Sequence, residues 1–177
     1  GGRVTGWRGD ERMYRIRLND PCNLRLDGKA LIDGTAWDYA YVELGDPGIP
    51  HAVVPVKNLR DFDTAKLREL GRRLRYYPEF PKGANVNFYE IIGADHIYER
   101  TYERGVEDFT YACGTGTGSV VTVLTLLGKV SGHQVRVDMT GGQLMVDVER
   151  EGNQVTNLYL TGPTNIVCKG EITDEAL

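Results

Sequence analysis

Histidine and cysteine are scarce in this chain of 177 residues, which has three of each. His51, His96 and His133 lie far apart in the sequence, and no Cys-x-x-Cys pair is present, so the ligand spacing of a zinc or iron–sulfur site is missing. We therefore expect no metal ion. An odd number of cysteines in a chain large enough to bury its own core is typical of a reducing compartment, which predicts the cytoplasm.

Long apolar runs and an excess of basic charge are also lacking. No stretch approaches the roughly 20 apolar residues of a membrane span, so we expect no membrane association. The chain has 21 Lys and Arg against 25 Asp and Glu, a net charge of −4, which disfavours binding to nucleic acid. The chain begins Gly-Gly-Arg rather than with methionine, and we expect it to be part of a longer protein.

Short segments with alternating apolar and polar residues are frequent, and they predict about ten strands. Asp27-Gly28 and Asp33-Gly34 are expected to mark turns, and Gly141-Gly142 a hairpin. Residues 63–75 carry leucines at helical spacing, which predicts a surface helix capped by Asp63 with its arginines in solvent. No repeat is found, so we expect a single domain over residues 1–177.

The most informative segment is residues 111–128, where Tyr-Ala-Cys-Gly-Thr-Gly-Thr-Gly-Ser is followed by an almost wholly apolar run. It predicts a reactive loop that leads into a buried helix. The unpaired N–H groups and positive dipole of a helix N-terminus favour anions, so we expect the thiolate form of Cys113 to be favoured. Gly114, Gly116 and Gly118 let a ligand approach the backbone, whose amides are suited to hold a carboxylate.

Two nucleotide-binding motifs are excluded for this segment. The glycine spacing differs from the dinucleotide fingerprint, and no lysine follows to complete a phosphate loop. One alternative stays open: Cys113 and the glycines serve only packing, since free cysteine is among the most buried residue types. His51, at the start of a predicted strand, is by itself more typical of a capped or solvated histidine than of a catalytic one.

Several short motifs follow one another in a recognisable order. They are Phe80-Pro81, Asn-Val-Asn-Phe at 85–88, Glu-Arg-Gly at 103–105, Ala-Cys-Gly-Thr-Gly at 112–116 and Thr-Gly-Pro at 161–163. Together they resemble the diaminopimelate epimerase family from about residue 50 to residue 171. The resemblance implies an α+β fold in which an antiparallel, β-barrel-like sheet wraps a central apolar helix, with one further surface helix.

The resemblance also implies a function. The family has two similar lobes, each supplying one cysteine, and this chain resembles the C-terminal lobe; a second Cys-Gly-Asn-Gly loop is absent from it. The implied reaction interconverts LL- and meso-diaminopimelate, in lysine and peptidoglycan precursor biosynthesis, with two cysteines, no cofactor and no metal. The implied partners are an amino-acid substrate, the N-terminal lobe and a second copy in a homodimer. The implied catalytic residues are Cys113, Glu103 and His51, and the implied substrate contacts are Asn85, Arg104, Gly114 and Thr115.

Two departures from the family pattern leave other hypotheses open. Ile49-Pro50-His51 stands where many relatives have Asn-Pro-His, and the segment between Arg104 and Cys113 is one residue longer than in some members. A site that has lost a polar contact can accept another substrate, so a relative acting on histidine or a proline derivative is the second hypothesis. A lobe without turnover is the third. A cysteine hydrolase is the weakest, because only His51 is available to assist Cys113.

Overall fold

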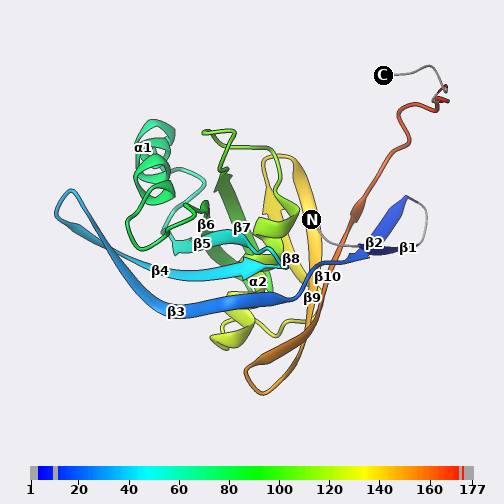
Figure 1. Ribbon diagram of the computed structural model, residues 1–177, viewed down its shortest axis with the longest axis horizontal. Helices are drawn as coiled ribbons and strands as arrows, with labels where there is room; N and C mark the ends of the chain where they lie inside the picture. The colour runs from blue at the N-terminus through cyan, green and yellow to red at the C-terminus, as the bar shows by residue number, and fades with distance from the viewer. Residues whose placement is uncertain (1–3, 10–11, 172, 174–177) are drawn as a thin grey trace.

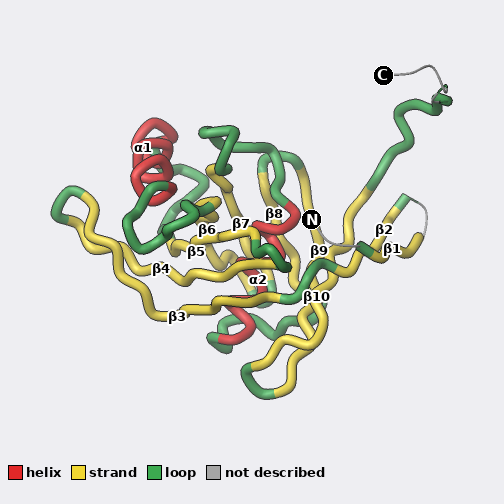
Figure 2. The backbone as a smooth tube through the Cα atoms, viewed as in Figure 1, coloured by secondary structure: helices red, strands yellow, loops and turns green. Residues whose placement is uncertain are grey.

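The computed structural model describes residues 4–9, 12–171 and 173 (Figure 1). Within these residues the chain forms ten strands and two helices, and Figure 2 shows that strands dominate the body. The strands are β1 (Thr5–Arg8), β2 (Met13–Arg17), β3 (Pro21–Ile32), β4 (Thr35–Leu44), β5 (Ile49–Pro55), β6 (Asn85–Gly93), β7 (His96–Tyr102), β8 (Val135–Met139), β9 (Gly142–Glu151) and β10 (Gln154–Pro163). The helices are α1 (Thr64–Arg75) and α2 (Gly114–Leu126).

All ten strands belong to one sheet in the order β1-β2-β10-β9-β8-β7-β6-β5-β4-β3. The expectation of an antiparallel sheet was wrong, because β5 pairs with β6 and β7 pairs with β8 in parallel. Each parallel pair is joined by a helix: α1 connects β5 to β6, and α2 connects β7 to β8. A crossover helix returns the chain to the same end of the sheet, so the next strand runs in the same direction. The fold class is therefore mixed-sheet α+β.

The apolar run after Cys113 forms α2, as predicted. Every residue from 116 to 125 is buried, and the helix contacts strands from both halves of the sheet order: β3, β4, β5 and β6, and also β9 and β10. Val120, Val121, Val123 and Leu124 are at the centre of the larger hydrophobic core. A helix that is apolar all round is stable only when it is buried in this way. Among the described residues, neither helix has the length and apolar character that crossing a bilayer would require.

The other predicted helix, α1, covers the opposite face of the sheet. Asp63 caps it, since its carboxylate accepts a hydrogen bond from the Lys66 amide at 2.8 Å. The helix contacts β3, β6 and β7. Leu67, Leu70 and Leu74 are buried in the second hydrophobic core. The sheet thus separates two cores, and α2 lies on the face that carries the candidate site.

One predicted turn is wrong. Asp27-Gly28 lies inside the long strand β3, where the pairing with β4 shifts register between Arg25 and Gly28. A side chain at Gly28 would meet the Tyr39 ring 2.3 Å away. The glycine therefore makes room for an aromatic ring on the neighbouring strand and does not reverse the chain. The turns at Asp33-Gly34 and before Gly142 form as predicted.

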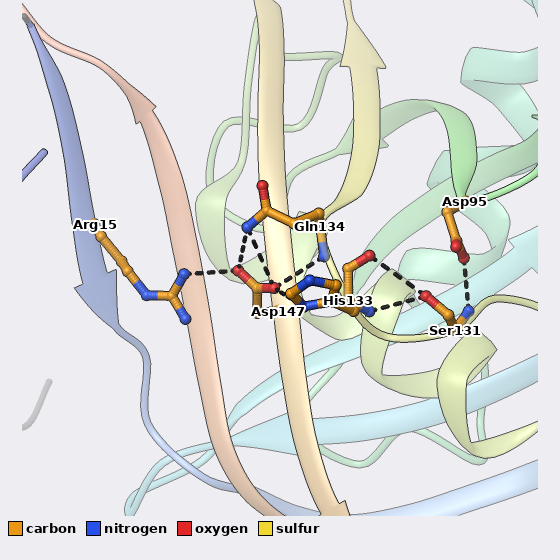
Figure 3. Close-up of polar contacts among 6 residues, drawn as sticks. All are labelled: Arg15, Asp95, Ser131, His133, Gln134 and Asp147. Carbon is orange, nitrogen blue, oxygen red and sulfur yellow. Dashed lines mark hydrogen bonds and ion pairs between the residues drawn. The ribbon is translucent and has the colours of Figure 1, made fainter. Parts of the chain in front are cut away.

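The β1–β2 hairpin and the segment after β10 extend away from the body (Figure 1). A polar cluster joins β2 to the rest of the sheet (Figure 3). The buried Asp147 on β9 accepts hydrogen bonds from Arg15 on β2 at 2.7 Å and from the Gln134 amide at 2.8 Å, and the His133 ring lies 3.1 Å away. A buried carboxylate needs such partners, so this cluster fixes where β2 lies on the sheet.

Candidate active site

Cys113 is the N-cap residue of α2 and is half-buried. Its backbone is extended, with φ −132° and ψ 100°, and its carbonyl accepts the first helical hydrogen bond from the Thr117 amide at 2.8 Å. The Sγ atom lies 3.7 Å from the Thr115 hydroxyl. The predicted placement of a cysteine at the start of a buried helix is therefore confirmed.

The expectation that this position favours the thiolate is wrong for the chain as it stands. Burial, together with the smaller effect of the nearby Glu103 carboxylate, raises the pKa of Cys113 to about 11. The Gly116 amide and the Thr115 hydroxyl lower the pKa, but by less than burial raises it. The free-energy cost of removing a thiolate from water exceeds the stabilisation that the helix N-terminus provides. Cys113 is consequently a protonated thiol at neutral pH.

Glu103 follows β7 and is held by the loop that leads back to α2. Its amide donates to the Asp108 carbonyl at 3.1 Å, and its carboxylate accepts a hydrogen bond from the Thr110 hydroxyl at 2.5 Å. These contacts fold residues 103–113 into a compact loop. The prediction that this loop returns Glu103 toward Cys113 is supported by the effect of the Glu103 charge on the Cys113 thiol.

Asn85 and Arg104 are fixed to each other. The Arg104 amide donates to the Asn85 side-chain oxygen at 2.8 Å, and the Asn85 side-chain nitrogen donates to the Pro50 carbonyl at 3.2 Å. The Arg104 guanidinium donates to the Lys82 carbonyl at 2.9 Å. Asn85 thus ties the end of β7 to the start of β5, next to its register partner His51.

His51 is fully buried and is not solvated or capped. Its Nδ1 atom lies 3.2 Å from the Asn87 side-chain nitrogen, while Nε2 has no hydrogen-bond partner among the described residues. Burial lowers the pKa of His51 to about 3, so the imidazole is neutral at physiological pH. Within the same described part, His51 makes no hydrogen bond to Cys113 or Glu103.

Asn87 was not among the predicted site residues. It is fully buried on β6, and it contacts His51, the Ala52 carbonyl and the Thr101 hydroxyl, the last at 3.1 Å. A side chain at Gly116 would meet the Asn87 oxygen at 2.3 Å and the Cys113 sulfur at 3.2 Å. Because Gly116 has no side chain, α2 approaches β6 closely, and the Asn87 side-chain oxygen and the Cys113 sulfur both lie next to Gly116. The signal was the alternation of two asparagines in one strand.

Gly116→Ala tests this close approach. Alanine favours a helix over glycine by about 1 kcal/mol, but displacing Asn87 and Cys113 costs about 1–3 kcal/mol, so we expect the free energy of unfolding to fall by up to about 2 kcal/mol. Urea denaturation followed by circular dichroism measures it. Gly114→Ala is the matched control, because its new methyl group meets only the flexible end of Leu160, at 3.0 Å. A Gly116→Ala chain as stable as the Gly114→Ala chain would contradict the contact.

Gly114 and Thr115 form the first turn of α2, next to Cys113. The Thr115 hydroxyl is near the sulfur, and its carbonyl accepts a hydrogen bond from Ser119 at 2.8 Å. The first-turn amides have no partners within the helix. No group of three or more potential metal ligands is found in the part of the chain that the structure describes.

Comparison with known proteins gives a consistent result. A sequence profile of the family described as Diaminopimelate epimerase matches residues 45–167. The Chlorobaculum tepidum diaminopimelate epimerase is 40% identical over 171 residues, which is 96% of this chain and 60% of the relative. The Leptospira biflexa protein of the same name is 34% identical over 94% of this chain and 51% of the relative. The chain thus spans half to three-fifths of the length of these relatives.

Solved structures share the fold. A probable proline racemase from Agrobacterium radiobacter K84 has a TM-score of 0.65 at 22% identity, over 91% of this chain and 54% of that one. A hydroxyproline epimerase from Agrobacterium vitis has a TM-score of 0.63 at 20% identity, over 86% of this chain and 50% of that one. With the profile match covering more than half of the sequence, these results identify the chain as a member of the diaminopimelate epimerase family.

Proposed function

We propose that this chain is the C-terminal lobe of a diaminopimelate epimerase that interconverts LL- and meso-diaminopimelate without a cofactor, in lysine and peptidoglycan precursor biosynthesis. The observation that carries the proposal is Cys113 at the N-terminus of α2, with Glu103 returned toward it by a compact loop. The match to the family supports it. The second cysteine comes from an N-terminal lobe that lies outside this sequence.

The proposed reaction needs two groups on opposite faces of the α-carbon. One thiolate removes the α-proton while one thiol returns a proton on the other face, so the two cysteines exchange protonation states in each turnover. The raised pKa of Cys113 keeps it protonated, so Cys113 is the thiol that acts as the acid when the reaction starts. The cysteine of the other lobe is then the thiolate that acts as the base.

The remaining residues have supporting roles in this proposal. Glu103 and His51 orient and tune the thiol, His51 through Asn87. Asn85 and Arg104 contact the substrate, and the amides of Gly114 and Thr115 hold its α-carboxylate, where negative charge develops. The contacts of α2 with strands from both halves of the sheet support a barrel-like wrapping around this helix, which keeps its N-terminus fixed.

Exchange of the α-hydrogen with deuterated water tests the proposal. The chain is incubated with LL-diaminopimelate, alone and with the separately expressed N-terminal lobe of the Chlorobaculum tepidum relative, and α-deuterium is measured by mass spectrometry. We expect label only in the mixture, because one thiol cannot serve both faces. Cytoplasmic location and a homodimer stay predictions, and fractionation and sedimentation would test them.

Other outcomes distinguish the rival functions. By the family resemblance, Ile49 stands where a polar residue is expected, and a structural neighbour is named as a hydroxyproline epimerase, so histidine and 4-hydroxyproline are included as substrates. Label gained from one of these instead of diaminopimelate would support the second function. No label with any substrate, in a mixture shown to contain the bound lobes, would overturn the proposal.

A further inference from the structure

A second carboxyl group lies under the N-terminus of α2 and has no part in the reaction proposed above. Glu99, on β7, is 1% exposed and occupies the same face of the strand as Thr101. One of its oxygens, Oε1, contacts the Thr117 hydroxyl in the first turn of α2. The other, Oε2, is buried and has no hydrogen-bond partner in the described part of the chain.

The Thr117 hydroxyl has more acceptors than protons. It lies within hydrogen-bonding distance of Glu99 Oε1 and also 3.1 Å from the Cys113 carbonyl. A hydroxyl carries one proton and can donate to only one of these oxygens. If Glu99 is protonated, it donates to Thr117, and Thr117 donates to Cys113. If Glu99 is ionised, Thr117 donates to the carboxylate and the Cys113 carbonyl loses this bond.

Burial favours the first arrangement. Burying an ionised carboxylate that has only one hydrogen bond is costly, whereas a neutral carboxyl group allows both the Glu99–Thr117 and the Thr117–Cys113 hydrogen bonds to form. In agreement, burial raises the pKa of Glu99 to about 8, against the lowering effect of Thr117. Glu99 is therefore neutral at pH 7.

We infer that Glu99 is a positioning residue: in its neutral form it donates to Thr117, which in turn holds the carbonyl of Cys113 and so fixes the cysteine at the start of α2. The inference rests on the proposed function only in assigning catalysis to Cys113. Neutrality has a second consequence, because an ionised Glu99 would add a negative charge beside the thiol and oppose thiolate formation.

Few other titratable groups lie with Glu99 on the side of the sheet that faces α2. Tyr89 is opposite Glu99 on β6, His51 is on β5, and Glu103 follows β7. The α2 segment after Cys113 carries no titratable residue, and no basic side chain within the described residues contributes to the shifted pKa of Glu99. Ionisation of Glu99 therefore acts mainly on the pKa of Cys113.

Two measurements on the chain without substrate test the inference, so a failure here is separate from a failure of the proposed reaction. The first is the infrared carbonyl band of a protonated carboxylic acid at pH 7, which we expect in the wild type and not in Glu99→Gln. Thr117→Val removes the hydrogen-bond partner and is expected to move this band to higher frequency. Thr117→Ser restores the hydroxyl and is expected to restore the band. No protonated band at pH 7 would overturn the inference.

The second measurement is the iodoacetamide reaction of Cys113 in a Cys22→Ala, Cys168→Ala background. At pH 7 we expect equal rates in the parent and in Glu99→Gln, because Glu99 is neutral and glutamine also donates to Thr117. At pH 9.5, where Glu99 is ionised, we expect Glu99→Gln to react about threefold faster, because the ionised carboxylate opposes thiolate formation. Glu151→Gln is the control, since Glu151 is exposed and lines a pocket with Leu126 at the other end of α2. A ratio of one at both pH values, with folding confirmed by circular dichroism, would overturn the inference.

Discussion

Cys113→Ala is expected to reduce α-proton exchange on diaminopimelate by about 10³-fold or more in the complemented, two-lobed protein, because a positioned acid or base contributes about 10²–10⁴-fold and here no other group replaces it. The methyl group of alanine fits where the thiol was, so the chain should fold normally. Solvent deuterium incorporation gives the rate, and binding of the N-terminal lobe is checked separately to exclude a failure of assembly.

Cys22→Ala and Cys168→Ala are the matched controls for this variant. Cys22 donates to the Gly45 carbonyl at 3.4 Å, and Cys168 is exposed beyond β10. We expect exchange rates close to the parent rate from both. Comparable losses in all three variants would show that the effect is not specific to Cys113, and the assignment of that thiol would be wrong.

The features that the sequence predicted well are those decided by local pattern. The run from Val120 to Leu127 has almost no polar face, and burial is the only stable arrangement for such a helix. Asp63 caps α1 because its short carboxylate reaches a first-turn amide within the same segment. Strand pairs joined by short turns, such as β8–β9 at Gly142, could also be predicted from the local sequence.

The features that the sequence could not give depend on distant segments. The parallel pairing of β5 with β6 depends on where α1 packs, and the sequences of the two strands do not indicate their relative direction. Gly28 looked like a turn because the Tyr39 ring that requires it is on another strand. The strand pattern places Glu99 on the same side of β7 as Thr101, but its neutrality depends on the depth at which α2 buries it.

The error over Cys113 has the same origin. Helix position alone favours a thiolate, but burial and the Glu103 charge come from packing, and they dominate. The buried thiol of Cys113 should therefore be a slow nucleophile in this chain. In the isolated chain, we expect the exposed Cys168 to react before Cys113 at neutral pH.

The buried His51 predicts how the stability of the chain depends on pH. Its pKa is about 3 in the folded chain and returns to its ordinary value of 6.5 on unfolding, so between these values the unfolded chain binds one more proton. Stability from this residue is therefore fully present above pH 6.5 and is lost as pH falls. The slope is at most about 1.4 kcal/mol per pH unit, or about 2–3 kcal/mol between pH 6.5 and 4.5.

His51→Leu removes this contribution, so the difference in free energy of unfolding between the wild type and His51→Leu should shrink or change sign as pH falls from 6.5 to 4.5. Urea denaturation at several pH values measures it, and the other titrating groups, Glu99 included, are common to both chains. Val53→Ala is the control, since Val53 is buried two residues along the same strand and does not titrate. It should lower stability by a similar amount at each pH. Equal slopes for the wild type and His51→Leu would mean that His51 has the same pKa in the folded and the unfolded chain. The imidazole would then be protonated in the folded chain at pH 4.5, and the assignment of a neutral, buried His51 would be wrong.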